Sequence, residues 1–588
     1  MKYRSSFNAI LAASSFGSVY AQSQTWCGKN FMPNQTAVAP GGQFDLPYGS
    51  TEPLLAFRCA PSFRPYLEED AESASFVIDT PIVYQYISGA YPIELGGSNT
   101  MSAGRSDLGS LNITISIGGS VLTTQEVPLN ATGVEVSVDL SGLQAQKTAY
   151  NVSCAATYTS SSSSSSNSSK LYTTSSGSGS SQPSGSSQQF KANSTLLYLP
   201  DTNGSVTKTD LRTGALWVRP ANGSGGAFAP IIPNGFYTSF DQYLAQNLSI
   251  IDTLKADGFN AIHPIPPFDN ATVFQQVLNR TQAAGLYLIY DMRSVYQNLS
   301  AVAEQVDALM TYPNLLSWET AHEPDGNSDP FGAAKAAYDL IYQMDGYHPI
   351  SIVLNCENYN FSPYVEGADI VIEDAYPLGI NATYSPVWHT PCNDTFGHCG
   401  CDNCEGSMVD IKARVQTYKD RLNIMGWDRT KSVWSAPQAF GSGAYWNITP
   451  TGQQWAAMNL ASLNHGAMGT ISFSYPTTTG NVTTIEGTAT NFTGVIADNV
   501  APFLVDPTVD FTGYTHDGVD IGKWNNGTVS LLVVANINGT GPYVPWTAMG
   551  LDASTTNASI VRVFSVNQNT NVTGFNFRPG GIGIWMAV

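Results

Sequence analysis

The 588-residue chain has few charged side chains: Asp, Glu, Lys and Arg make up 12% of it, about half the share in an average globular protein. Basic residues are the scarcer kind, with 25 Lys and Arg against 45 Asp and Glu, and the formal net charge is −20. So acidic a chain is unsuited to nucleic acid or to an anionic membrane surface, and we expect neither as a partner. The sequence also lacks a run of about 18 apolar residues, which argues against a membrane-spanning helix.

A second feature explains how so weakly charged a surface stays in solution. The sequence contains 22 Asn-x-Ser/Thr acceptor sites for N-linked glycans. They include Asn112, Asn151, Asn247, Asn298, Asn447 and Asn571. Glycans on a good share of these sites would supply the missing polarity.

Residues 1–21 have the features of a secretory signal peptide. Lys2 and Arg4 precede an apolar stretch at residues 7–16, and Val19-Tyr20-Ala21 has the small-x-small pattern of a cleavage site. Together with the glycan acceptor sites, this predicts a secreted, N-glycosylated protein of fungal type, extracellular or associated with a cell wall.

The eight cysteines agree with export. Cys392, Cys399, Cys401 and Cys404 lie close together and, with His398, superficially resemble a zinc site. In an oxidising compartment two disulfides across one long loop are favoured instead. We expect Cys356, in an apolar segment, to be a buried free thiol, and we expect no metal and no cofactor.

The two ends of the chain have the pattern of β-domains. Residues 22–215 contain short alternating runs, such as residues 75–84 and 111–117, which predict a β-sandwich. A Ser/Gly tract at about residues 159–189 cannot bury apolar surface, and we expect it to be a disordered insertion. Strand-like segments recur after residue 506 and predict a small C-terminal β-sandwich over residues 507–588.

The central residues, 216–506, alternate strand-like and helix-like segments. Strands are expected at residues 231–237, 260–264, 286–291, 315–320, 351–355, 369–374, 432–437 and 470–475, and helices at residues 240–256, 301–310, 333–344, 410–424 and 452–463. Eight such units predict an α/β fold, a closed (β/α)8 TIM barrel. The alternative, a doubly wound open sheet, has fewer strands and would need a Gly-rich phosphate loop, which the sequence lacks.

Functional side chains of such barrels follow the C-terminal ends of the strands. These positions hold a set of carboxylates, aromatic rings and amides: Tyr237, His263, Asp291, Arg293, Trp318, His322, Glu323, Glu357, Asp374, Tyr376, Trp434 and Gln438. Aromatic rings stack on sugars, carboxylates and amides bind hydroxyls, and two carboxyls can perform acid–base chemistry on an acetal. The pattern therefore predicts a polysaccharide or oligosaccharide as the ligand.

One motif resembles a known family. His322-Glu323-Pro324, at the end of the fourth expected strand, resembles the Asn-Glu-Pro of the clan of retaining β-glycosidases of the cellulase and β-galactosidase type. The resemblance implies a glycoside hydrolase in which Glu323 is the general acid/base. Two departures stand out: His322 replaces the Asn that contacts the sugar 2-hydroxyl, and Gln438 stands where the clan has its nucleophilic Glu.

An amide cannot form a glycosyl ester, so the second carboxylate is expected elsewhere. The sixth expected strand ends in Glu373 and Asp374, whose side chains point to opposite faces. We favour Asp374 because it is nearer the mouth of the barrel, with Glu357 in reserve. The alternative role for Asp374 is a structural ion pair with Arg293 or another basic residue of the barrel.

The other candidates each have two interpretations. Trp318, Trp434 and Tyr376 are either sugar platforms or packed core. Asp291 and Arg293 either pair with each other or recognise an acidic sugar. His263 binds a hydroxyl or caps a loop, and Tyr237 is the substrate-facing residue of the first strand. The cysteine-rich loop at residues 379–406 is expected to wall one side of the cleft.

Three functions are therefore open. The first is a secreted glycoside hydrolase acting on cell-wall or plant polysaccharide. The second, favoured by Gln438, is a non-catalytic carbohydrate-binding or cell-wall protein on a degenerate barrel. The third is a metal hydrolase using His263, His322 and Asp291, although these lack the His-x-His spacing usual in such sites.

Overall fold

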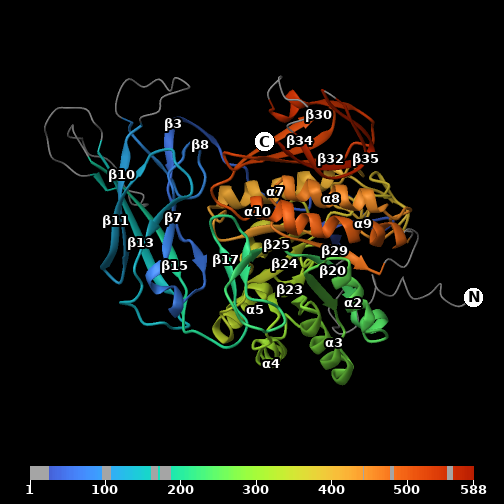
Figure 1. The fold of residues 1–588 in the computed structure, drawn as a ribbon, viewed down its shortest axis with the longest axis horizontal. Coiled ribbons are helices and arrows are strands. Elements are labelled where there is room, and N and C mark those ends of the chain that lie inside the picture. Colours follow the sequence, from blue (N-terminus) through green and yellow to red (C-terminus); the bar gives the residue numbers. More distant parts are fainter. Residues whose placement is uncertain are drawn as a thin grey trace, which may run out of the picture.

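The computed structural model describes residues 25–95, 108–159, 170–171, 187–441, 443–476, 482–551, 560–571 and 573–587. The expected signal peptide and most of the expected Ser-rich insertion lie outside these residues. The described chain is built around a closed barrel of eight parallel strands, with antiparallel sheets flanking it (Figure 1). The expected (β/α)8 barrel with additional β-domains is thus confirmed.

The barrel strands follow one another in chain order. They are β20 (Asn234–Ser239), β21 (Ala261–Ile265), β22 (Tyr287–Asp291), β23 (Leu315–His322), β24 (Ile350–Leu354), β25 (Ile370–Glu373), β28 (Ser432–Ser435) and β29 (Thr470–Tyr475), and β29 pairs with β20 to close the ring. The strands are buried almost throughout, because the barrel interior covers one face and the helices cover the other. This burial on both faces produces the near-continuous apolar runs that made the strands recognisable in the sequence.

Helices surround this barrel. They are α2 (Ser249–Ala256), α3 (Ala271–Ala284), α4 (Leu299–Leu309), α5 (Phe331–Met344), α6 (Phe361–Val365), α7 (Val409–Met425), α8 (Gly452–Asn464), α9 (Val482–Val495) and α10 (Ala501–Leu504). The single helix expected at residues 240–256 is divided into a helical turn, η3 (Phe240–Leu244), and α2. The division arises because the Asn247 side chain accepts a hydrogen bond from the backbone N–H of Ser249 and starts a new helix there.

Within the described residues, no helix combines the length and hydrophobicity that crossing a membrane requires.

The N-terminal domain is a β-sandwich. One sheet has the order β11 (Ser120–Pro128), β10 (Ser110–Ile117), β13 (Tyr150–Tyr158), β15 (Gln188–Leu196) and β14 (Lys170–Leu171); the other has β12 (Val134–Ser137), β7 (Ser75–Asp79) and β4 (Arg58–Pro61). Alternate side chains of both sheets, including Ile113, Ile115, Phe76 and Ile78, form one core. The disulfide between Cys59 and Cys154 joins β4 to β13.

Shorter strands connect this sandwich to the barrel. They are β3 (Gly49–Ala56), β5 (Phe63–Arg64), β6 (Tyr66–Leu67), β8 (Ile82–Gln85), β9 (Ala90–Pro92), β16 (Tyr198–Leu199), β17 (Thr207–Asp210), β18 (Leu216–Val218) and β19 (Ala229–Ile231). Ion pairs between the domains include Arg429 with Asp79 and Arg64 with Asp369. Ile231, expected in the first barrel strand, belongs to β19 and pairs with Leu216 instead.

The C-terminal residues form one antiparallel sheet of six strands: β30 (Asp510–His516), β31 (Val519–Asn525), β32 (Ser530–Asn536), β33 (Tyr543–Pro545), β34 (Ile560–Asn571) and β35 (Gly574–Ala587). One face of the sheet lies over the barrel helices (Figure 1). Side chains such as Leu531, Val533 and Ile584 share a core there with Trp455 of α8. The opposite face packs on the helical turn η5 (Trp546–Met549).

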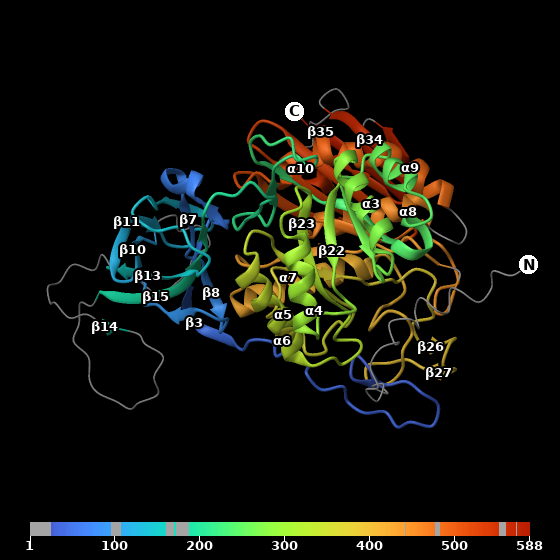
Figure 2. The ribbon, with the colours of Figure 1, turned by 90° about the horizontal axis from the view of Figure 1, so that it is seen from below.

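The first described residues do not join the sandwich. The small hairpin of β1 (Thr25–Trp26) and β2 (Lys29–Asn30) lies against the loops at the C-terminal end of the barrel (Figure 2). Cys27 forms a disulfide with Cys356, so the expectation of a free thiol at Cys356 was wrong. Cys392 pairs with Cys399 and Cys401 with Cys404, as the two disulfides expected in the long loop, which also contains β26 (Tyr384–Ser385) and β27 (Thr390–Pro391).

Candidate active site

Two carboxyl groups lie side by side at the C-terminal end of the barrel. Glu323 directly follows β23 and Asp374 directly follows β25, and a carboxyl oxygen of one lies within 4.8 Å of a carboxyl oxygen of the other. Between them, Nδ2 of Asn355 donates to both, at 3.0 Å from Glu323 Oε1 and 3.2 Å from Asp374 Oδ1. The backbone of Glu323 has a φ of 53°, a left-handed conformation that is uncommon for a residue other than glycine and that recurs at functional sites.

Burial changes the proton affinity of this pair. Asp374 has no exposed surface, and burial together with the adjacent charge of Glu323 raises its pKa well above the ordinary value. Burial also raises the pKa of the half-buried Glu323, while its hydrogen bonds with Asp374 and Asn355 oppose that rise. Since two adjacent carboxylates are costly to ionise together, the arrangement favours one proton held between them, on the side of Asp374.

A buried charged network adjoins the pair, with Glu319 at its centre. This residue lies on β23 and was not singled out in the sequence. Its carboxyl accepts a hydrogen bond from Tyr237 Oη at 2.7 Å and lies 3.0 Å from His322 Nδ1 and 3.5 Å from the Arg293 guanidinium. Burial raises the pKa of Glu319 to about 7. The signal that could have found it is an ionisable residue inside an otherwise apolar strand.

Asp291 forms the second half of the network. Arg293 donates to it at 2.7 Å, and His263 Nε2 lies 3.1 Å away. Burial alone would raise the pKa of Asp291. The Arg293 guanidinium outweighs this effect and holds the pKa below its usual range. Within the described residues the ion-pair partners of Arg293 are Asp291 and Glu319, not Asp374. The structure therefore favours the mutual pairing of Asp291 and Arg293.

His322 links the network to the carboxyl pair. A nitrogen of its imidazole lies within 4.8 Å of carboxyl oxygens of Glu323 and Asp374. Burial and the positive charge of Arg293 lower the pKa of His322 well below its usual range, so the ring is neutral at physiological pH. Five sequence-predicted residues are thus brought together next to Glu323 and Asp374: Tyr237, His263, Asp291, Arg293 and His322.

Two predicted platforms lie elsewhere. Trp318 and Trp434 have no exposed surface. Trp318 donates its indole N–H to Asp345 at 2.8 Å, and Trp434 packs in the core that the barrel shares with α8. Side chains alternate along a strand, so Trp318 faces outward because Glu319 faces inward. Both tryptophans therefore have the packed-core arrangement.

Tyr376 and Gln438 lie in the loops that follow β25 and β28. Tyr376 is 5% exposed, stands among Phe440, Trp446 and Phe473, and its hydroxyl has no hydrogen-bond partner among the described residues. The buried amide of Gln438 donates to the carbonyls of Leu378 and Phe440 and accepts the N–H of Leu378 at 2.8 Å. Gln438 therefore ties two loops together through main-chain contacts.

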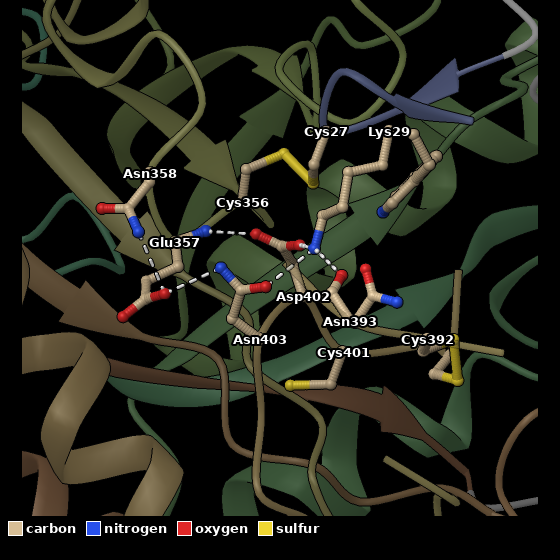
Figure 3. Close-up of polar contacts among 12 residues, drawn as sticks. Cys27, Lys29, Cys356, Glu357, Asn358, Cys392, Asn393, Cys401, Asp402 and Asn403 are labelled. Atoms are coloured by element: carbon tan, nitrogen blue, oxygen red, sulfur yellow. Dashed lines mark hydrogen bonds and ion pairs between the residues drawn. A yellow bond between two sulfur atoms is a disulfide. The ribbon is translucent and has the colours of Figure 1, made fainter. Parts of the chain in front are cut away.

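Glu357 turns away from the pair and toward the cysteine-rich loop. Its carboxylate accepts hydrogen bonds from Asn358 at 3.1 Å and Asn403 at 2.9 Å (Figure 3). Its backbone N–H donates to Asp402, which also pairs with Lys29. These contacts connect Glu357 to the packing of the loop around residues 392–404.

Three described groups have the spacing of metal ligands, and their chemistry differs. In the first, Cys27 and Cys356 are joined as a disulfide and cannot ligate. In the second, formed by His263, Asp291 and Glu319, the Arg293 guanidinium already supplies the positive charge. The third is His322 with the carboxyl pair, where the Asn355 amide directs N–H groups at both carboxyls, an arrangement that suits a shared proton better than a cation.

No family model matches this sequence, and neither does any curated protein. Among solved structures, a glycoside hydrolase family 5 protein from Bacteroides vulgatus has a TM-score of 0.38 at 9% identity, over 61% of this chain and 89% of that one. A β-glucuronidase from Ruminococcus gnavus in complex with D-glucuronic acid has a TM-score of 0.31 at 10% identity, over 74% of this chain and 63% of that one. A glycoside hydrolase family 30 subfamily 8 xylanase from Clostridium acetobutylicum has a TM-score of 0.36 at 10% identity, over 61% of this chain and 96% of that one. Likenesses this distant carry no information on activity.

Proposed function

We propose that this protein is a secreted glycoside hydrolase that cleaves a polysaccharide or oligosaccharide with the carboxyl pair of Glu323 and Asp374. The observation that carries the proposal is the pair itself. Two carboxyls from different strands meet at the end of the barrel where such folds hold their chemistry, and their burial and proximity favour one proton held between them. A buried pair of this kind costs stability, which is typical of groups kept for a reaction.

Hydrolysis of a glycosidic bond needs one acid and one carboxylate, and this pair supplies both. Glu323, which reaches the surface, takes the proton from Asp374 and delivers it to the leaving oxygen as the C–O bond breaks. Asp374 is then the carboxylate that bonds to the anomeric carbon, and water cleaves this ester while Glu323 accepts the water's proton. The carboxyl oxygens lie within 4.8 Å of each other, closer than the roughly 6.5–9.5 Å of inverting enzymes, so we propose that the anomeric configuration is retained.

Secretion and glycosylation are part of the same proposal. The glycan-acceptor residues Asn112, Asn151, Asn247, Asn298 and Asn447 all have exposed side chains, so glycans on them would meet no steric obstacle. Four disulfides join the described cysteines, which suits an oxidising compartment. We therefore place the protein outside the cell or in the cell wall, with wall or plant polysaccharide as its substrate.

A second function, carbohydrate binding without catalysis, is favoured by one observation. Gln438 stands in the position where the clan has its nucleophile. Its side-chain amide makes hydrogen bonds to the main chain of Leu378 and Phe440. A barrel that had lost catalysis would keep such a packing residue and would still present polar groups at its mouth.

Hydrolysis assays on a panel of wall polysaccharides and aryl glycosides separate the two functions. Wild type is expected to release reducing sugar, and Glu323→Gln to lose about 10²–10⁴-fold in rate, the usual contribution of a general acid/base. Glu357→Gln is the matched control, because this carboxylate is held by Asn358 and Asn403 away from the pair. Saturable binding of a polysaccharide with no cleavage across the panel would establish the second function instead.

A further inference from the structure

The amide that joins the carboxyl pair is itself held by a distant residue. The indole Nε1–H of Trp26 donates to Asn355 Oδ1 at 3.1 Å. A side-chain amide has one acceptor end and one donor end, so this contact decides which end faces the carboxyls. With Oδ1 occupied by Trp26, Nδ2 points at Glu323 and Asp374.

Covalent and packing contacts keep Trp26 in this place. The residues that directly follow Trp26 and Asn355 are Cys27 and Cys356, which form a disulfide (Figure 3). One face of the indole stacks on His398, with ring centroids 4.5 Å apart. On another side Gly326 approaches so closely that a Cβ there would lie 2.6 Å from the indole.

The hairpin that carries Trp26 is anchored further along. Lys29 forms a buried ion pair with Asp402 at 2.5 Å and donates to Asn403 at 2.7 Å (Figure 3). On the other side of the contact, Asp325 accepts the backbone N–H groups of Asn355 and Cys356 and so fixes the main chain there. Both ends of the Trp26–Asn355 hydrogen bond are therefore held independently of it.

We infer that Trp26 and Asn355 are positioning residues of the carboxyl pair: the indole N–H fixes the orientation of the Asn355 amide, and this orientation sets the proton affinity of Glu323 and Asp374. Only the kinetic part of the inference rests on the proposed function. An N–H donated to a carboxylate favours its ionised form. An amide turned by 180° would present oxygen lone pairs to the same carboxyls and favour their protonated forms.

Other charged and titratable groups also face the pair, from several elements. Asp325 and Arg293 act on Glu323, Arg414 acts on Asp374, and both carboxyls are close to the neutral His322 and to Tyr376. None of these groups makes a hydrogen bond to the Asn355 side chain within the described residues. A substitution that removes only the indole N–H therefore isolates the contribution of the amide.

The decisive variant is Trp26→Phe, which keeps an aromatic ring against His398 and removes the N–H. The matched control is Trp388→Phe, because the Trp388 indole donates to Tyr445 at 2.7 Å in the same group of loops and does not bond Asn355. Asn355→Ala removes both donated bonds, with a thermal melt to check that it folds. Two readouts apply: the pH dependence of kcat/KM, and infrared difference spectra of the protonated carboxyl C=O stretch across pH, which need no substrate.

The expected result follows from the loss of a donor to the ionised carboxyl. The acidic limb of the pH profile and the infrared titration should both shift to higher pH, by about one unit for Asn355→Ala and by less in the same direction for Trp26→Phe. Trp388→Phe should match wild type. If Trp26→Phe and Trp388→Phe titrate alike, the inference is overturned. If Glu323→Gln keeps full activity, the proposed function fails, while the infrared titration still decides the role of Trp26.

Discussion

Glu323 and Asp374 accept hydrogen bonds from the same nitrogen atom, Nδ2 of Asn355. The three residues follow three consecutive barrel strands, β23, β24 and β25. The candidate catalytic carboxyls of this barrel and the amide between them therefore lie at the ends of neighbouring strands. In the clan of retaining β-glycosidases that the motif around Glu323 resembles, the two carboxylates lie on the fourth and seventh strands. Stability, pH dependence and reactivity should all report on this arrangement.

Replacing one member of the pair should separate stability from activity. Asp374→Asn removes a buried carboxyl but keeps an N–H that can donate to Glu323. We expect the melting temperature to rise at neutral pH, since the variant no longer holds two adjacent acids in a buried site. We also expect hydrolysis to fall by at least about 10²-fold, in line with the loss of a participating carboxylate. Calorimetry and rate assays on the same preparation test both; unchanged activity would remove Asp374 from the mechanism.

The protein should be most stable in mildly acidic solution. Burial raises the pKa of Glu319, Asp325 and Glu373 to about 7. The folded chain then binds these protons more tightly than the unfolded chain, whose carboxyls titrate near pH ~4. The stabilisation that these three carboxyls contribute is therefore complete below about pH 4 and is lost as the pH rises toward 7. Melting temperatures measured from pH 4 to pH 8 should decline.

A matched variant identifies the source of that decline. Glu373→Gln fits its surroundings, since the amide oxygen can accept the N–H of Ala375 and the Ser435 hydroxyl can turn to accept the amide N–H. The variant should show a shallower decline than wild type over the same pH range. A curve that keeps the full slope would mean that Glu373 is not one of the titrating groups.

Restoring the clan's residue at Gln438 should not restore the clan's chemistry. In Gln438→Glu, the carbonyls of Leu378 and Phe440 lose their donor and face a buried carboxylate. We expect a loss of about 2–4 kcal/mol in unfolding free energy and no gain in hydrolysis. The exposed Gln275→Glu serves as the control, with a change within about 0.5 kcal/mol. Higher activity in Gln438→Glu would show that a carboxylate there can reach the substrate.

Chelation should leave the reaction unchanged. The Asn355 N–H groups point at Glu323 and Asp374, which suits a protonated pair rather than a bound cation. Hydrolysis measured after prolonged incubation with EDTA, with and without added Zn²⁺, Mn²⁺ or Ca²⁺, should give one rate. Loss of activity on chelation and recovery with a single metal would instead favour a metal hydrolase built on His322 and the pair.

Much of the fold could be predicted because it depends on local patterns. Barrel strands buried on both faces are continuous apolar runs in the sequence. The first and last residues of each barrel strand therefore lie within three residues of the expected positions. The position of Glu323 followed from the end of the fourth strand. Its neighbour Asp374 was chosen only by its nearness to the mouth, because the phase of an apolar strand does not show which face is inward.

The rest depends on contacts between residues distant in sequence. Nothing near Trp26 or Cys27 indicates that they meet Asn355 and Cys356, 329 residues away in the chain. For Trp318 the alternation rule would have sufficed: its neighbour Glu319 faces the barrel interior, so Trp318 had to face outward. That inference required recognising Glu319, an acid in a buried strand, as an inward-facing functional residue.

The most direct test of the central claim is covalent trapping. With the sugar identified in the hydrolysis panel, wild type would be incubated with the corresponding 2-deoxy-2-fluoro glycosyl fluoride, digested and analysed by peptide mass spectrometry. Cleavage by the Glu323–Asp374 pair with retention predicts one glycosyl adduct per chain, on Asp374. An adduct on another carboxylate, or turnover of the natural substrate with inverted anomeric configuration and no adduct, would contradict it.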